Sequence, residues 1–247
     1  MKPRRAGLAL AVALVTTACA GGDATVTPGP TSTSASAVPS TAPPPTTVPP
    51  TTVPPTTAAP KAAPPTGLAD VQELEPSVVV ALKGLNGDNF TGGPLPGYET
   101  HRAFLQPPAA EALARVQRGL ATRNLGLKIY DGYRPYRATQ YMVDWARSHG
   151  QGHLVGPYIA TVSYHNSGQA VDLTLVERST GRDIDMGTGY EAFGPAVHTA
   201  NATGVAAENR AILVNAMHAE GFENYPGEWW HFNYFVAGAK VLDEPVR

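Results

Sequence analysis

The chain has 247 residues, a formal net charge of −2 at pH 7 and a single cysteine. A nucleic-acid-binding surface needs an excess of basic residues, and this nearly balanced charge gives no indication of one. One cysteine cannot form an intrachain disulfide. The composition therefore excludes a disulfide-stapled scaffold and does not point to a nucleic-acid partner.

Residues 1–20 have the pattern of an export signal. A basic start, with Lys2, Arg4 and Arg5, precedes a short apolar run from Ala6 to Val15 and then small residues. The apolar run is too short to span a membrane as a helix. We expect this segment to direct the protein out of the cytoplasm, and it does not contribute to the fold.

Cys19 follows the apolar run and allows two fates for the exported protein. In the first, the signal is cut before Cys19 and the cysteine is lipidated, which would anchor the protein to the outer face of the cell membrane. In the second, an ordinary signal peptidase cuts after Ala20 and the protein is secreted. We favour the lipid anchor, although Thr16 stands where a lipoprotein signal prefers leucine.

Residues 21–66 are rich in Thr, Pro, Ala and Ser and include the repeat TTVPPTTVPPTT at 46–57. The segment has almost no large apolar side chains, so it cannot bury enough surface to fold. Prolines keep such a chain extended at roughly 3 Å per residue. We predict a disordered linker here and one globular domain over residues 67–247, which is long enough for a sizeable core.

Helices and strands are predicted in an irregular order along this domain. The helix over 107–126 starts with two prolines and ends at Gly126, as helices commonly do. Strands and helices do not alternate strictly, and most strands come late, which favours an α+β fold with a small antiparallel sheet and helices packed on it. The other predicted elements are strands over 78–82, 127–135, 170–176 and 228–236, helices over 136–150 and 206–222, and a long polar segment over 177–204.

The stretch SYHNSGQAVDLTLV, residues 163–176, combines a strand pattern with polar residues. Apolar side chains alternate with Asp172 and Thr174, which is the pattern of a half-buried strand. An aspartate in such a strand is either solvated or held by a group that offsets its charge. His165 precedes the strand across a predicted turn, which suggests that His165 and Asp172 share a metal ion.

A catalytic zinc ion needs three protein ligands and one open position for water. His165, Asp172 and His231 could supply the ligands, with Glu228 as the carboxylate that takes a proton from the metal-bound water. Residues three apart in a flat strand point to opposite faces. Glu228 and His231 can therefore share a site only if Glu228 lies on the Pro-Gly turn before the last strand.

Each of these parts also has a purely structural explanation. His165 and Asp172 could form an ordinary hydrogen-bonded pair, and Glu228 and His231 could do the same in an aromatic core. Arg134 could be a surface arginine, although the proline after it favours the extended backbone of a fixed side chain. The catalytic interpretation gains its weight from the combination.

Taken together, the motifs resemble those of the zinc D-Ala-D-Ala peptidases. SYHNSGQAVDLTL is similar to the family signature Ser-x-His-x-x-Gly-x-Ala-x-Asp, and GEWWHF is similar to its Glu-x-x-His. DGYRP, DNFTG and DMGTGYE resemble the D-alanyl-D-alanine dipeptidase branch, to which the vancomycin-resistance dipeptidase belongs. The resemblance runs in order from about Val78 to Phe235, which is nearly the whole domain.

The resemblance implies one Zn²⁺ per chain, bound by His165, Asp172 and His231. It implies that Glu228 is the catalytic base and then the acid, and that Arg134 faces the oxyanion. The metal, its water and these two side chains would suffice for hydrolysis without a covalent enzyme intermediate.

The resemblance also implies two residues that bind the substrate. Ser163 matches a serine beside the metal that contacts substrate. Glu191 stands where the family has an aspartate that holds the free amine of the substrate, and its side chain is longer by one methylene. We therefore expect Glu191 to define the amino side of the substrate site.

The implied function is zinc-dependent hydrolysis of the D-Ala-D-Ala dipeptide outside the cytoplasm, in cell-wall peptide turnover or recycling. A resistance role would require a cytoplasmic enzyme, whereas this chain has an export signal. One alternative is a D,D-carboxypeptidase acting on peptidoglycan stem peptides, which needs an open groove on the amino side of the scissile bond. Another is a catalytically silent wall-binding module, which would have no reason to keep Glu228. No partner protein, no nucleic acid and no membrane contact beyond Cys19 is implied.

Overall fold

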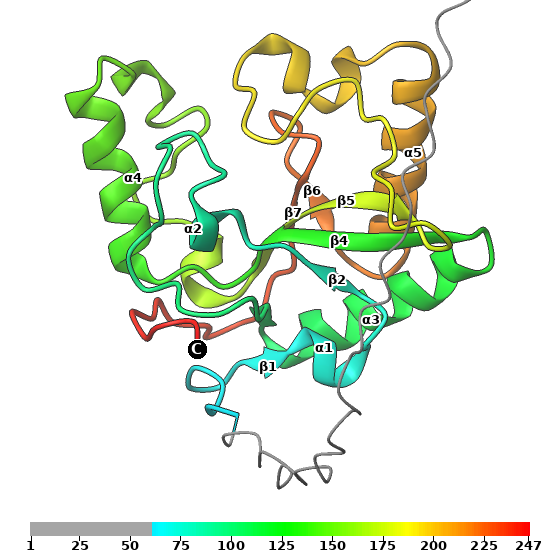
Figure 1. Cartoon of the computed structure of the whole chain (residues 1–247), viewed down its shortest axis with the longest axis horizontal. Coiled ribbons are helices and arrows are strands. Elements are labelled where there is room, and N and C mark those ends of the chain that lie inside the picture. Colours follow the sequence, from blue (N-terminus) through cyan, green and yellow to red (C-terminus); the bar gives the residue numbers. More distant parts are fainter. Residues whose placement is uncertain (1–60) are drawn as a thin grey trace, which may run out of the picture. The chain divides into compact units, whose positions relative to one another are not determined.

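The computed structural model describes residues 61–247, so the predicted signal, Cys19 and most of the predicted linker lie outside the described residues. A five-stranded sheet, in the order β2-β4-β5-β7-β6, forms the centre of the domain (Figure 1). A two-stranded sheet pairs β1 with β3. The strands are β1 Ala69–Asp70, β2 Val79–Val80, β3 Phe104–Leu105, β4 Leu125–Asp131, β5 Ala170–Glu177, β6 Glu223–Asn224 and β7 His231–Asn233.

Three long helices surround the sheet, and two helices of one turn accompany its N-terminal part. α3 packs against β4, and α5 contacts both α3 and β5. α4 stands apart from α5 at the other side of the domain (Figure 1). The helices are α1 Val71–Leu74, α2 Lys83–Asn86, α3 Pro107–Ala121, α4 Tyr136–Ser148 and α5 Gly204–Ala219. No helix within residues 61–247 is both long enough and apolar enough to cross a lipid bilayer.

The predicted α+β class is confirmed, and the large sheet is antiparallel at every pair except β2 with β4. These two strands run parallel because the chain passes through α3 before it returns to the sheet. α1, α2 and the short pairing of β1 with β3 were not predicted from the sequence. They occupy the stretches before and between the predicted elements, where no periodic pattern extends over more than a few residues.

The prediction of a half-buried strand over 170–176 was wrong. β5 is buried on both faces. Asp172 and Thr174 expose only 3% and 1% of their surface. One face packs toward α5, and the other is covered by the segment after β5, where Tyr190 packs against Tyr130 with the two rings tilted. Asp172 is therefore held by partners and is not solvated.

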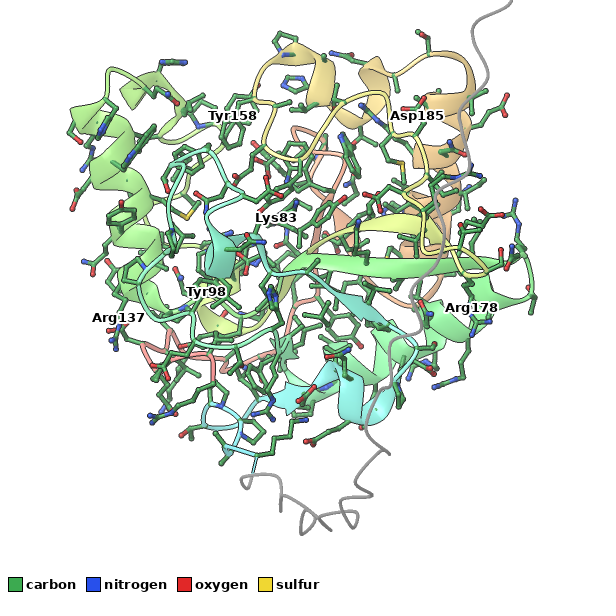
Figure 2. All side chains as sticks on the ribbon, viewed as in Figure 1. Lys83, Tyr98, Arg137, Tyr158, Arg178 and Asp185 are labelled. Carbon is green, nitrogen blue, oxygen red and sulfur yellow. The ribbon has the colours of Figure 1, made fainter. Side chains whose placement is uncertain are left out.

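Several element boundaries differ from the prediction, and strand pairing accounts for the end of α3. α3 ends at Ala121, since Leu125 and the residues after it pair with β5. The last strand is shortened to β7, because residues 226–230 form turns before it. Side chains from the helices and both sheets fill the interior of the domain (Figure 2).

Candidate active site

Strand pairing places two of the predicted metal ligands beside each other. Asp172 in β5 lies directly opposite His231 in β7 in the antiparallel register. Residues opposite each other in this way project from the same face of the sheet. The Asp172 Oδ1 atom and the His231 Nδ1 atom lie 2.9 Å apart.

A capped turn brings the third predicted ligand to the same place. His165 belongs to the 3₁₀ turn Tyr164–Ser167, and the Ser163 hydroxyl accepts a hydrogen bond from the His165 backbone N–H. The side chain of Asn166 completes this cap by accepting from the Ser163 N–H and also donates to the Arg134 carbonyl. The turn therefore links the histidine to the segment that carries Arg134.

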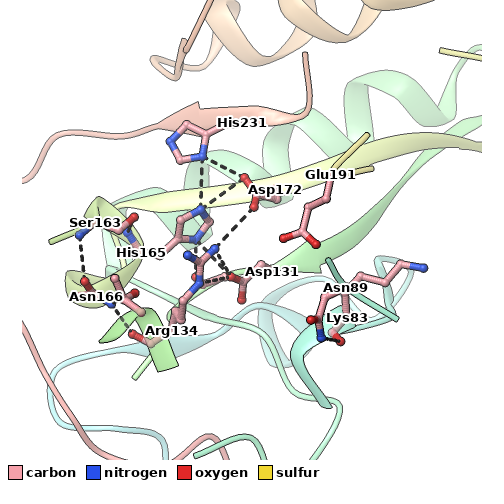
Figure 3. A network of polar contacts seen from close by, with 12 residues as sticks. Lys83, Asn89, Asp131, Arg134, Ser163, His165, Asn166, Asp172, Glu191 and His231 are labelled. Atoms are coloured by element: carbon pink, nitrogen blue, oxygen red, sulfur yellow. Dashed lines mark hydrogen bonds and ion pairs between the residues drawn. The ribbon is translucent and has the colours of Figure 1, made fainter. Parts of the chain in front are cut away.

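The three ligand atoms form a compact triangle (Figure 3). The His165 Nε2 atom is 3.2 Å from both Asp172 Oδ1 and His231 Nδ1. Ligands at about 2.0–2.1 Å from a tetrahedral ion lie about 3.3 Å apart. His165, Asp172 and His231 are thus spaced as three ligands of one metal ion.

The remaining polar atoms of this cluster are satisfied by other groups. The His165 Nδ1–H group donates to the Gly132 carbonyl at 2.7 Å, and the His231 Nε2–H group faces Asn233 Oδ1 at 3.1 Å. These bonds select the tautomers that leave the inner nitrogen of each ring free to bind a metal. The Tyr190 hydroxyl donates to Asp172 Oδ2 at 3.0 Å.

Glu228 lies on the turn before β7, as sharing a site with His231 requires. Its Oε2 atom is 4.0 Å from His231 Nδ1. Glu228 is only 7% exposed, and burial raises the pKa of its carboxyl to about 8, against the opposing effect of His231. A carboxylate with such a pKa is a stronger base than an exposed glutamate.

Arg134 is buried and held by an acid that the sequence analysis did not single out. Its Nε and Nη2 atoms lie 2.7 and 2.6 Å from Asp131 Oδ2. Asp131 is held in turn by the Tyr98 hydroxyl, which donates to Oδ1 at 2.6 Å. The Arg134 Nη2 atom also approaches Asp172 Oδ2 at 3.8 Å, so the guanidinium borders the metal cluster.

Ser163 and Glu191 line the same pocket as the cluster. In the view of Figure 3 they lie on opposite sides of the three ligands. The Glu191 backbone has a φ of 55°, which is unusual for a residue other than glycine. Its carboxylate accepts a hydrogen bond from the Phe90 N–H at 2.8 Å, and burial raises its pKa to about 7.

The pocket encloses about 270 Å³. This volume is just below the roughly 300–1,000 Å³ of pockets that take drug-sized ligands, so it suits a smaller molecule. Its wall includes the aromatic side chains of Tyr158 and Phe193, whose ring centroids are 5.2 Å apart. His198, which lies outside the metal cluster, faces the Tyr158 hydroxyl at 3.2 Å.

Sequence reasoning missed the residues that support the site from behind. Asp131 lies in the motif DGYRP and Tyr190 lies in DMGTGYE. Each is a polar residue close in sequence to a predicted site residue, and this proximity could have identified them. Tyr98 lies in no such motif. Cys19, the predicted lipidation site, is outside the described residues.

Comparison of the sequence with protein families gives a match over residues 65–245 to the family described as D-ala-D-ala dipeptidase. The D-alanyl-D-alanine dipeptidase of Enterococcus faecium is 34% identical over 184 residues, which cover 67% of this chain and 90% of that protein. The D-alanyl-D-alanine dipeptidase of Streptomyces coelicolor is 33% identical over 180 residues, with 66% and 89% covered.

Solved structures similar to this chain include the D,D-dipeptidase VanXYg in complex with a D-Ala-D-Ala phosphinate analogue, with 18% identity and a TM-score of 0.37. The match covers 69% of this chain and 67% of that one. The D,D-pentapeptidase VanY in complex with Zn(II) matches with 15% identity and a TM-score of 0.36, over 64% and 86% of the two chains. The sequence matches decide the assignment: the chain belongs to the D-Ala-D-Ala dipeptidase family of metallopeptidases.

Proposed function

We propose that this enzyme hydrolyses the free dipeptide D-Ala-D-Ala with one bound zinc ion. The observation that carries the proposal is the convergence of the metal-ligand cluster, Glu228, Arg134 and Glu191 on one small pocket. His165, Asp172 and His231 would hold the ion. When bound there, zinc lowers the pKa of its water toward neutrality and polarises a carbonyl oxygen.

Two buried side chains then have roles in the reaction. Glu228 takes a proton from the attacking water and returns it to the leaving amine of the second residue, because its buried carboxylate lies beside His231 in the pocket. Arg134 stays ionised, since Asp131 and its other neighbours raise its pKa against the effect of burial. Its fixed positive charge stabilises the negative charge that develops on the carbonyl oxygen.

Glu191 would recognise the free ammonium group of the dipeptide. Within residues 61–247, its carboxylate has the Phe90 N–H as a hydrogen-bond donor and forms no ion pair. A substrate ammonium would supply the missing positive charge. An acylated amine would not, and its acyl group would also have to fit into the small pocket that Tyr158 and Phe193 line.

The substrate preference tests this proposal directly. The purified enzyme should contain one zinc per chain and should cleave D-Ala-D-Ala at least ~100-fold better, by kcat/KM, than its N-acetyl form. This ratio corresponds to about 2.7 kcal/mol in transition-state binding. A preference for the acetylated dipeptide or for a stem peptide would show that the enzyme is a D,D-carboxypeptidase and not a dipeptidase.

We further propose that the enzyme acts outside the cytoplasm, in the turnover or recycling of cell-wall peptides, anchored through a lipid on Cys19. The basic and apolar residues before Cys19 support this location. Cys19→Ser should move the protein from the membrane fraction to the soluble extracellular fraction. A parent protein already soluble outside the cell would exclude the anchor, and a protein found in the cytoplasm would exclude export.

A further inference from the structure

Helix α5 holds the segment that carries Glu191. The helix belongs to none of the motifs singled out in the sequence. The Asn209 side chain donates to the Asp185 carbonyl at 2.8 Å, and the Arg210 Nε–H group donates to the Met186 carbonyl at 2.8 Å. Asp185 lies beside α5 at the start of this stretch (Figure 2). Residues 185–198, here called the 185–198 segment, are therefore attached to α5 by side-chain hydrogen bonds.

Arg210 attaches both ends of the segment. Besides bonding Met186, its Nη1 atom donates to the His198 carbonyl at 2.7 Å and its Nη2 atom donates to the Ala196 carbonyl at 3.2 Å. Its guanidinium also packs 5.7 Å from the centroid of a Trp229 ring. Only 2% of Arg210 is exposed, and within residues 61–247 its guanidinium contacts carbonyl and hydroxyl oxygens and an aromatic ring but no carboxylate. A buried charge is costly without compensation, so these carbonyl groups are what makes the position tolerable.

The backbone between the two ends is constrained at two places. Gly187 has a φ of 81°, and a Cβ atom there would lie 2.9 Å from Ala206 Cβ on α5. Glu191 has a φ of 55°, a strained conformation for a non-glycine residue that persists only when its surroundings enforce it. Between them, the Tyr190 hydroxyl bonds to Asp172.

The same contacts reach the turn that carries Glu228. The Trp229 Nε1–H group donates to Thr188 Oγ1 at 2.8 Å, and the Arg210 Nη2 atom lies 3.4 Å from that oxygen. Removal of the guanidinium would leave the carbonyl groups of Met186, Ala196 and His198 without this donor. Of the side-chain hydrogen bonds that attach the 185–198 segment to α5, only that of Asn209 would remain.

We propose that Arg210 is a positioning residue for recognition of the substrate ammonium group. It acts through the 185–198 segment, which it holds so that Glu191 keeps its strained backbone and faces the pocket. The inference rests on the proposed function of Glu191. It does not give Arg210 contact with substrate or with the reacting atoms.

Kinetics of Arg210→Met and Arg210→Lys, with D-Ala-D-Ala as substrate, test this role. Methionine should raise KM about 10-fold or more and change kcat less than about threefold, since the base and metal ligands stay in place. Lysine keeps the charge but lacks the planar fork that reaches several acceptors, so its KM should fall between those of the parent and the methionine variant. Arg115→Met is the matched control, because Arg115 pairs with Glu220 after the end of α5, away from the 185–198 segment.

A double-mutant cycle with Glu191→Gln separates positioning from general destabilisation. If Arg210 acts through Glu191, then Arg210→Met should raise KM less than about twofold in the Glu191→Gln background. An equal effect in both backgrounds, or a loss of kcat with unchanged KM, would overturn the proposal. If Arg210→Met does not fold, Asn209→Ala replaces it in the cycle and should show the same coupling with a KM increase of about threefold. The preference of the parent for the free over the acetylated dipeptide tests the proposed function separately, before any variant is made.

Discussion

The metal-ligand cluster and the 185–198 segment form two walls of one pocket, yet they are held in different ways. The cluster rests on paired strands and a capped turn, and its outer polar atoms bond to groups close by in the fold. The 185–198 segment contains no strand and includes a strained residue, and it is held by long side chains from α5. Backbone pairing therefore positions the groups that would bind a metal ion, whereas side-chain contacts position the group that would bind the substrate amine.

The largest expected effect comes from breaking the cluster itself. His231→Ala should abolish both metal binding and detectable hydrolysis, because two ligands do not hold a catalytic zinc ion tightly. Metal content by atomic emission and kcat/KM for D-Ala-D-Ala are the measurements. His153→Ala, which removes an exposed histidine outside the site, is the control. Full metal occupancy in the His231 variant would show that the ligand set is misassigned.

The second largest effect is expected at Glu228, which lies beside the cluster but is not one of the predicted metal ligands. Glu228→Gln should keep the metal and the fold and lower kcat about 1,000-fold or more, since one group serves as general base and general acid. The metal content should remain that of the parent. A variant that retains turnover within a few-fold of the parent would make Glu228 a structural residue.

The metal-ligand cluster was also more predictable from the sequence than the 185–198 segment. His165 and Asp172 lie within one motif, and the requirement that Glu228 lie on a turn follows from strand geometry alone, so their convergence with His231 could be anticipated. The residues that support the cluster could not be anticipated, because Tyr98 and Asp131 are 33 residues apart in the sequence and meet only in the fold. The second region shows the same limit. Glu191 was inferred by resemblance, whereas its attachment through Arg210 depends on how α5 docks. The burial of both faces of β5 depends on the same segment.

Glu191→Gln sharpens the comparison by removing charge from the second region while leaving the first unchanged. KM for D-Ala-D-Ala should rise about 10- to 100-fold, and the preference over the N-acetyl dipeptide should shrink. The parent should show the same loss in acid, because protonation of Glu191 below about pH 7 removes the charge that pairs with the ammonium group. The glutamine variant should lack this part of the pH dependence of KM. An unchanged KM in the variant would exclude Glu191 from amine binding.

Glu191→Gln should also stabilise the folded protein. This result would show that the carboxylate is kept for substrate binding and does not contribute to stability. A carboxyl whose pKa is raised by folding makes the folded state less stable as pH rises from its unfolded value of 4.5 to about 7. The cost reaches about 3 kcal/mol at most once the group is ionised. Urea unfolding at pH 8 should therefore give Glu191→Gln a higher free energy of unfolding than the parent, with little difference at pH 4. A less stable variant at pH 8 would mean that the carboxylate is structural.

The smallest effect is expected where the first region has redundant support. The Tyr98 hydroxyl bonds Asp131 Oδ1, while Arg134 is held by the other oxygen, Oδ2. Tyr98→Phe should therefore lower kcat/KM less than about tenfold, because the guanidinium keeps its partner. Loss of a buried hydrogen bond to a charged group should still reduce the free energy of unfolding by about 1–3 kcal/mol. Tyr141→Phe, at an exposed position on α4, is the control for both measurements. A loss of activity as large as that of Glu228→Gln would mean that the Tyr98 hydroxyl, and not the fold around Asp131, sets the position of Arg134.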